Sequence, residues 1–194
     1  AASTKWNFHR HSPGIGVGGH CIPVDPYYYI EIAEKLGQPS IISEAARRIN
    51  SAMPKHSAKE IEGVFHDGLE NKRVLVLGYS YKPNVGDSRE TPVKFLIEEL
   101  RDKGAEILVH DPLVEPREIP SWATSVDGKL KCRNVDIIVL ATSHRGFDYS
   151  NGVFWRKLES VVRKKEIFDG RRFLPAEKMI ADGWSYNGIG FPNT

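Results

Sequence analysis

Residues 73–110, RVLVLGYSYKPNVGDSRETPVKFLIEELRDKGAEILVH, decide the fold of this 194-residue chain. The runs RVLVL at residues 73–77 and EILVH at residues 106–110 are short and apolar, as buried strands are. Residues 92–103 between them have the spacing of an amphipathic helix, and Gly104 is a good stop for that helix. A strand, a helix and a second strand in this order predict parallel strands with the helix on one face of a sheet.

The same alternation continues to the end of the chain. We predict further strands at residues 135–141, 166–168 and 184–189, with helices at residues 154–162 and 175–182. Together these elements predict a Rossmann-like open parallel sheet over residues 69–194, an α/β fold. Ligands of such sheets bind beyond the carboxyl ends of the strands. Those ends lie at residues 78–87, 111–112, 142–146 and 169–172.

The region before residue 69 has a helical pattern instead. Asp25 followed by Pro26 is a good N-cap and first turn, and Gly37 is a good stop for this first helix. A second apolar repeat at helical spacing continues to Gly68, where we expect that helix to end. Pro54 lies inside the repeat and predicts a kink or a break between two helices.

Composition and charge bound the class of protein. Lys and Arg number 27 against 25 Asp and Glu, a net charge of +2, and 40% of the residues are hydrophobic. This balance excludes an intrinsically disordered chain and gives no strong argument for a nucleic acid or an anionic membrane as partner. The longest purely apolar run, residues 137–141, is too short to span a bilayer. We therefore expect neither nucleic acid nor membrane as a partner.

The chain has two cysteines, Cys21 and Cys132, which are too few for a disulfide framework. A reducing compartment follows, and we predict a cytoplasmic protein. Cys132 has no chemical motif around it, so we expect it to pack in the core. One or two of the three tyrosines at residues 27–29 are also expected in the core.

Residues 14–19, GIGVGG, match the dinucleotide-binding pattern G-x-G-x-x-G but not its context. That fingerprint follows a buried strand and opens a helix. The preceding residues, FHRHSP, are not a buried strand, and Pro23 forbids a smooth entry into a helix. We predict instead a loop whose glycines let the backbone approach a ligand closely.

Cys21 ends this segment and lies just before the first helix. The partial positive charge of a helix N-terminus lowers the pKa of a nearby thiol, which suits a nucleophilic thiolate. A buried structural cysteine is the alternative. His9, His11, His20 and Cys21 could also ligate a metal, but their spacing fits no usual zinc pattern, and we predict no metal site.

Six motifs stand along the chain in a fixed order. They are TKWNF (4–8), PGIGVGGHCIPVDPYY (13–28), GYSYKPN (78–84), DSRETP (87–92), HDP (110–112) and FDGRR (168–172). Together they resemble motifs of the UDP-glucose/GDP-mannose dehydrogenase family, and residues 13–28 resemble its catalytic-cysteine segment. His20 before the cysteine and VDPY after it resemble the branch that acts on UDP-N-acetylhexosamines.

The resemblance implies an enzyme with three parts: an N-terminal Rossmann domain for NAD, a central helical dimerisation domain and a C-terminal domain for the sugar nucleotide. Residues 1–68 would be the end of the central domain, and residues 69–194 the UDP-sugar-binding domain. The chain begins at Ala1 without an initiator methionine, which fits a C-terminal piece of a longer protein. We expect the full-length protein to be a homodimer, NAD to be bound mainly outside these residues, and the piece to be inactive alone.

The reaction that the resemblance implies oxidises the C6 alcohol of a UDP-sugar to a carboxylate in two hydride transfers, for polysaccharide biosynthesis. UDP-N-acetyl-D-mannosamine is the expected substrate, with UDP-glucose and UDP-N-acetylglucosamine as alternatives. Cys21 would add to the intermediate aldehyde as a thiohemiacetal, which becomes a thioester that water hydrolyses. Asp25 would help to activate that water, in addition to its role as the predicted N-cap.

The resemblance also assigns the substrate-binding residues. Lys82 would reach the sugar and the forming carboxylate with Tyr81 beside it, although an exposed loop lysine is the alternative for Lys82. Arg171 rather than Arg172 is expected to bind the sugar. The remaining expected substrate contacts are Gly16, Gly18, Gly19 and His20.

Arg89 resembles the arginine that meets the NAD pyrophosphate, and an ion pair with Asp87 or Glu90 is the alternative. Two further functional hypotheses remain open from the sequence. One is a nucleotide-binding module without catalysis. The other is a metal-binding protein built on the His and Cys cluster.

Overall fold

The computed structural model describes residues 1–8 and 11–191 of the chain. Its main body is a six-stranded sheet in which all neighbouring strands are parallel, in the order β3-β2-β1-β4-β5-β6. The strands are β1 (Arg73–Leu77), β2 (Glu106–His110), β3 (Thr124–Ser125), β4 (Ile137–Leu140), β5 (Glu166–Asp169) and β6 (Ser185–Gly188). This sheet confirms the predicted α/β fold.

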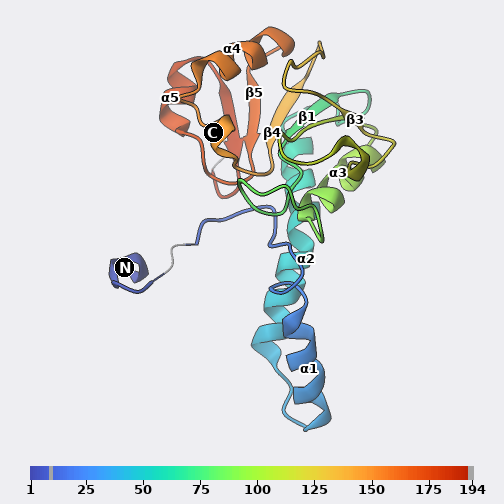
Figure 1. The fold of residues 1–194 in the computed structure, drawn as a ribbon, viewed down its shortest axis with the longest axis vertical. Helices are drawn as coiled ribbons and strands as arrows, with labels where there is room; N and C mark the ends of the chain where they lie inside the picture. The colour runs from blue at the N-terminus through green and yellow to red at the C-terminus, as the bar shows by residue number, and fades with distance from the viewer. Residues whose placement is uncertain (9–10, 192–194) are drawn as a thin grey trace.

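Helices cover both faces of the sheet, with α2 and α3 on one face and α4 and α5 on the other (Figure 1). α1 folds back along the first half of α2, and these two helices form a hairpin that projects from the sheet (Figure 1). In the described part of the chain, none of the helices is both long and apolar enough to cross a membrane. The helices are α1 (Asp25–Lys35), α2 (Ile41–Glu62), α3 (Pro92–Asp102), α4 (Gly152–Val161) and α5 (Ala176–Ala181), with 3-10 turns η1 (Ala2–Thr4), η2 (Pro116–Glu118) and η3 (Arg145–Phe147).

Alternate residues of the central strand pack into opposite faces of the sheet. Val74 and Val76 of β1 belong to the core under α2 and α3, whereas Leu75 and Leu77 belong to the core under α4. All four side chains are fully buried, and each such aliphatic side chain contributes about 1.5–3 kcal/mol. Burial on both faces fixes the register, which aligns the carboxyl end of β1 with that of β4.

α2 ends at the C-cap residue Gly63 rather than at the predicted Gly68. It is one helix that continues through Pro54, so of the two alternatives predicted there the break is absent. Ala58 and Ile61, after the proline, are fully buried in the core against the sheet. That packing compensates for the backbone hydrogen bond that Pro54 cannot donate. The last turns of α2 therefore pack with the sheet, ahead of the domain boundary predicted at residues 68 and 69.

One further expectation was wrong, and one strand was not predicted. The side chains of Tyr27, Tyr28 and Tyr29 are all exposed, because α1 buries only Ile30 and Ala33. The sequence analysis also missed β3, a two-residue edge strand whose side chains are exposed and which therefore has no apolar run.

Candidate active site

Three loops meet at the carboxyl edge of the sheet because β1, β4 and β5 are neighbouring parallel strands. We call residues 78–84, 141–145 and 169–172 the sheet-end loops. In open α/β sheets this edge is where ligands bind, and here it lies at the reversal of strand order between β1 and β4.

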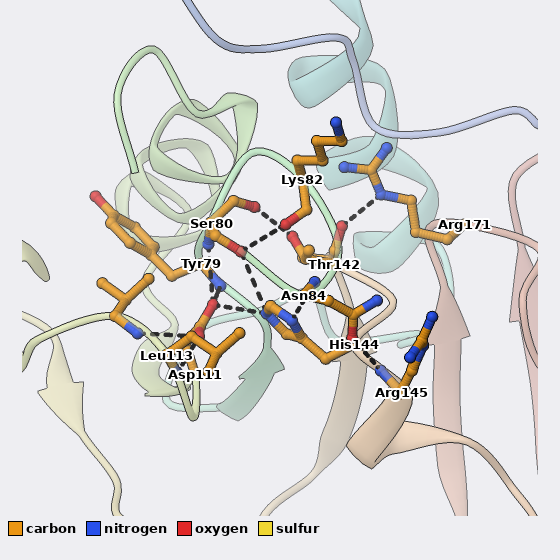
Figure 2. Close-up of polar contacts among 12 residues, drawn as sticks. Tyr79, Ser80, Lys82, Asn84, Asp111, Leu113, Thr142, His144, Arg145 and Arg171 are labelled. Carbon is orange, nitrogen blue, oxygen red and sulfur yellow. Dashed lines mark hydrogen bonds and ion pairs between the residues drawn. The ribbon is translucent and has the colours of Figure 1, made fainter. Parts of the chain in front are cut away.

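A buried carboxylate holds the first of these loops. Asp111, just after β2, accepts hydrogen bonds from the backbone N–H of Tyr79 at 2.7 Å, of Ser80 at 3.0 Å and of Leu113 at 2.8 Å (Figure 2). The Nε2 atom of His144 lies 3.0 Å from the same carboxylate, and both side chains are buried. Burial by itself would raise the pKa of Asp111, but the hydrogen bonds from His144 and the backbone hold it well below its usual range.

His144 joins this carboxylate to the far end of the loop. Its Nδ1 atom accepts a hydrogen bond from the backbone N–H of Asn84 at 2.9 Å, so the ring hydrogen lies on Nε2 and is donated to Asp111. The Ser80 hydroxyl donates to the Lys82 carbonyl at 3.2 Å, and the Thr142 hydroxyl donates to the Ser80 carbonyl at 2.6 Å. The backbone on both sides of Lys82 is therefore fixed, while its side chain is left free of this network (Figure 2).

A second buried carboxylate, Asp169 at the end of β5, holds the loop that carries Arg171. It accepts the backbone N–H of Arg171 at 2.9 Å and the hydroxyl of Tyr186 at 2.9 Å. Arg171 Nε donates to the Ala141 carbonyl at 2.7 Å, whereas its buried Nη2 has no hydrogen-bond partner among the described residues. Burial lowers the pKa of Arg171, and the charge of Asp169 acts in the opposite direction.

Arg171 and Lys82 point to the same side, away from the Asp111 and His144 pair (Figure 2). Arg172 behaves differently, because it is exposed and its guanidinium lies 5.1 Å from the centre of the Phe191 ring. Of the two neighbouring arginines, Arg171 is thus the one at the cavity described below.

Residues 14–19, which we call the glycine loop, lie against these side chains. Ile15 anchors the loop because its side chain is fully buried in the core under α2 and α3. A Cβ atom built on Gly14 would lie 2.6 Å from Arg171 Nη1, and one built on Gly18 would lie 2.5 Å from the Glu90 carbonyl oxygen. Close approach to other parts of the protein therefore favours glycine at these positions, whereas the predicted approach to a ligand stays a prediction. The loop neither follows a strand nor opens a helix.

The glycine loop, Cys21 and the two cations enclose one cavity of about 350 Å³. Cys21 is exposed, and its carbonyl accepts the backbone N–H of Val24 at 2.9 Å and of Asp25 at 2.8 Å. The thiol therefore stands on the turn that leads into α1, where the helix N-terminus favours negative charge. The cavity is lined by Gly16, Val17, Gly18, Gly19, His20, Cys21, Ile22, Tyr81, Lys82 and Arg171.

Two of the predicted site residues do not line this cavity. Asp25 is exposed and is the first residue of α1; the N-cap is Val24 and no side chain caps the helix, so the predicted N-cap role of Asp25 was wrong. Its own N–H is already bonded to Cys21, which places it inside the helical turn. Arg89 donates to Asp87 at 2.6 Å, the predicted alternative, and its hydrogen bonds lower the pKa of Asp87 to about 2.

The ion-pair partner of Arg89 is nevertheless joined to the cavity wall, because the backbone N–H of Tyr81, which lines the cavity, donates to the Asp87 carbonyl at 3.0 Å. Asp87 is the main cause that raises the pKa of Arg89, with further contributions from Tyr81 and Cys21. NAD would need a glycine-rich turn between a strand and a helix, and the described residues contain no such turn.

The other candidates lie elsewhere. Cys132 is buried, as expected of a packing residue. His9 lies outside the described residues, and within the described ranges there is no group of three His, Cys, Asp or Glu that could hold a metal ion.

The sequence analysis gave no role to Asp111, His144 or Asp169, which hold the loops in place. Two signals were available for the two aspartates: each follows an apolar strand run, and they lie in the motifs HDP (110–112) and FDGRR (168–172).

Comparison with known proteins identifies the family of this chain. Residues 75–176 match the UDP binding domain of the UDP-glucose/GDP-mannose dehydrogenase family, and residues 1–52 match the central domain of that family. UDP-N-acetyl-D-mannosamine dehydrogenase of Pyrococcus horikoshii is 34% identical over 97% of this chain and 42% of the relative. UDP-N-acetyl-D-glucosamine 6-dehydrogenase of Salmonella typhi is 31% identical over 92% of this chain and 42% of the relative.

Solved structures show the same likeness. The structure of UDP-D-ManNAc dehydrogenase from Pyrococcus horikoshii has a TM-score of 0.78 and 30% identity, covering 100% of this chain and 43% of that one. The NDP-N-acetyl-D-galactosaminuronic acid dehydrogenase from Methanosarcina mazei Go1 has a TM-score of 0.75 and 28% identity, covering 93% of this chain and 40% of that one. This chain spans about two fifths of the length of such relatives, and it belongs to the UDP-glucose/GDP-mannose dehydrogenase family.

Proposed function

We propose that this chain supplies the nucleophile and the sugar-binding groups of an NAD-dependent UDP-N-acetyl-D-mannosamine-type 6-dehydrogenase. One observation carries the proposal: the Cys21 thiol shares a cavity with Lys82 and Arg171, and Arg171 keeps a buried N–H group without a partner among the described residues. A buried N–H group that has no hydrogen-bond partner costs free energy unless a ligand accepts its hydrogen bond. The names of the relatives make a UDP-sugar the supported ligand.

In this proposal Cys21 works on the aldehyde formed from the C6 alcohol. The thiolate adds to the aldehyde carbon, and a C–S bond forms in a thiohemiacetal. Loss of a hydride leaves a thioester; water then attacks the thioester carbon, the C–S bond breaks, and the uronate and the thiolate are released. NAD, when bound, accepts the hydride in each of the two oxidations.

The surrounding side chains have separate roles. Lys82 and Arg171 bind the sugar and the carboxylate that develops at C6, since both are cations that line the cavity together with Cys21. Backbone groups of Gly16, Gly18 and Gly19 line the same space, with His20 and Tyr81 at its wall. Asp25, one turn beyond Cys21 on the solvent side, accepts a proton from the attacking water.

The dinucleotide is held mainly by a part of the enzyme other than these residues. Arg89 contacts its pyrophosphate, and the support for this role is an exposed guanidinium held by Asp87 in the loop that bonds to Tyr81. The 194 residues alone therefore bind UDP-sugar but do not oxidise it. The test is NADH formation, followed by absorbance, when the isolated chain is mixed with UDP-sugar and NAD. Formation of NADH would contradict the proposal.

We also propose that the full-length protein is a homodimer through its helical part. The hairpin of α1 and α2 exposes large apolar side chains that a partner would cover, which supports this proposal. They are Ile32, Leu36, Ile41, Ile42 and Ile49. Light scattering on the full-length protein checks the expected dimer, and a monomer at micromolar concentration would contradict it.

Calorimetric titration of the 194-residue chain tests the proposed function. UDP-N-acetylmannosamine is expected to bind more tightly than UDP-N-acetylglucosamine, UDP-glucose or UDP. Lys82→Gln should weaken its binding, whereas Lys164→Gln, at an exposed lysine on the surface, should not. Tightest binding of UDP-glucose would move the substrate to that alternative. Equal binding of UDP and all UDP-sugars would support the nucleotide-binding module instead.

A further inference from the structure

The glycine loop is tied to α2 by one side chain, Asn50. The Oδ1 atom of Asn50 accepts a hydrogen bond from the Val17 backbone N–H at 2.8 Å, and its Nδ2 atom donates to the Val17 carbonyl at 3.2 Å. A single amide thus satisfies both polar backbone groups of one loop residue, 33 positions away in sequence. Such a bidentate pair fixes both the distance and the orientation of the loop.

The loop contacts α2 one turn before Pro54, a proline inside the helix. Pro54 has no N–H, so the Asn50 carbonyl lacks its normal helical donor. Gly16, with φ at +133°, faces this carbonyl: a Cβ built there would lie 3.5 Å from it and 3.0 Å from the Pro92 Cβ. The loop is therefore seated between α2 and the start of α3, and a side chain at residue 16 would not fit.

Packing of the Val17 side chain does not hold this part of the loop, because that side chain is 49% exposed. The residues on both sides, Gly16 and Gly18, line the cavity that contains Cys21. Asn50 does not line that cavity, so it does not touch the ligand proposed there. Its influence on the site passes through the loop backbone.

We infer that Asn50 is a positioning residue that holds the glycine loop, and through the loop Cys21, against Lys82 and Arg171. The inference deepens the proposed function and rests on it for the identity of the ligand. Two variants separate the hydrogen bonds: Asn50→Leu removes both, and Asn50→Asp keeps the acceptor but places an oxygen against the Val17 carbonyl. Arg48→Leu, at an exposed position of the same helix, is the matched control.

Amide hydrogen exchange of the ligand-free chain is the first measurement. Exchange in the segment of residues 15–20 should accelerate about tenfold in Asn50→Leu, because an amide that loses its acceptor exchanges without local opening. Asn50→Asp should show a smaller acceleration, while β1 and the Arg48→Leu control keep the wild-type rates. Unchanged exchange at residues 15–20 in Asn50→Leu would overturn the inference.

The second measurement compares the affinities for two ligands, UDP-N-acetylmannosamine and UDP. A general structural defect would lower both affinities equally, whereas a positioning role would not. In Asn50→Leu the affinity for UDP-N-acetylmannosamine should fall about tenfold and the affinity for UDP less than about twofold. The reason is that the proposed function places the glycine loop at the sugar end of the ligand. Equal weakening of both ligands would overturn the positioning role. If the wild-type chain bound no UDP-sugar, the proposed function would fail, and the hydrogen-exchange comparison would then decide the inference by itself.

Discussion

The sheet-end loops and the glycine loop form two walls of one cavity, but they are held in different ways. The side chains of Asp111 and Asp169 are buried and organise the sheet-end loops by accepting hydrogen bonds from several backbone N–H groups. The glycine loop has no buried charge in it. It is held by the buried Ile15 side chain, by close backbone contacts and by Asn50.

This difference separates the proposed binding groups from the proposed nucleophile. Lys82 and Arg171 are positioned by the core of the sheet domain before any ligand arrives. Cys21 is exposed and belongs to a segment whose position depends on backbone fit to α2 and α3. Substitutions in or beneath the sheet-end loops should therefore lower stability or ligand affinity strongly. Substitutions in the glycine loop should mainly displace the proposed nucleophile.

Loss of a buried carboxylate should have the largest effect. Asp111→Ala leaves the N–H groups of Tyr79, Ser80 and Leu113 without their acceptor. We expect unfolding to become easier by about 3 kcal/mol, a fall in Tm of about 6–12 °C. Thermal unfolding checks this, with Asp67→Ala as the control, since Asp67 forms only an exposed ion pair with Lys72. A shift below about 2 °C in Asp111→Ala would contradict the account.

Arg171→Gln should have the next largest effect, on affinity. Binding of the uronate product of UDP-N-acetylmannosamine should weaken about 100-fold, the size of a lost charge-assisted pair of hydrogen bonds. Arg172→Gln is the matched control, because Arg172 is exposed beside Phe191, and its affinity should stay within about twofold of wild type. Equal losses in the two variants would refute the assignment of Arg171 to the cavity.

A methyl group in the glycine loop should act more weakly. A Cβ at Gly18 would lie 2.5 Å from the Glu90 carbonyl oxygen, so Gly18→Ala must displace the loop. Titration should show UDP-N-acetylmannosamine binding weakened about tenfold with little change in UDP binding. Gly146→Ala is the control because a Cβ there meets nothing within 4 Å. Wild-type affinity in Gly18→Ala would show that the loop does not face the sugar.

The pH dependence of stability should be the smallest effect and should come from the sheet-end region. Burial lowers the pKa of His110, against opposing contributions from a backbone hydrogen bond to Val126 and the charges of Asp111 and Asp127. The unfolded chain therefore binds the proton first as pH falls, and stability is lost below about pH 6.5, by no more than about 1.4 kcal/mol per pH unit. Urea unfolding at several pH values measures the slope, which His110→Phe should flatten. An equal slope in the variant would assign the effect to another group.

The sequence predicted the parts that depend on local pattern. The core strands were predicted because each is a short apolar run in the sequence, as residues 74–77 are. The cavity residues Cys21, Lys82 and Arg171 were predicted from the motifs that contain them. The Asp111 and His144 contact joins residues 33 positions apart in different loops, and the contact of Asn50 with Val17 is equally distant. Neither leaves a periodic signal, because each is created only when the sheet and α2 are assembled.

Protection of Cys21 from alkylation tests the central claim most directly, namely that the thiol, Lys82 and Arg171 share one UDP-sugar site. Iodoacetamide should alkylate the exposed Cys21 and leave the buried Cys132 unmodified as an internal reference, and mass spectrometry measures the extent at each residue. UDP-N-acetylmannosamine should slow modification of Cys21 in the wild-type chain, and the same concentration should give no protection in Arg171→Gln. Undiminished alkylation of Cys21 in the wild-type chain saturated with this UDP-sugar would contradict the account.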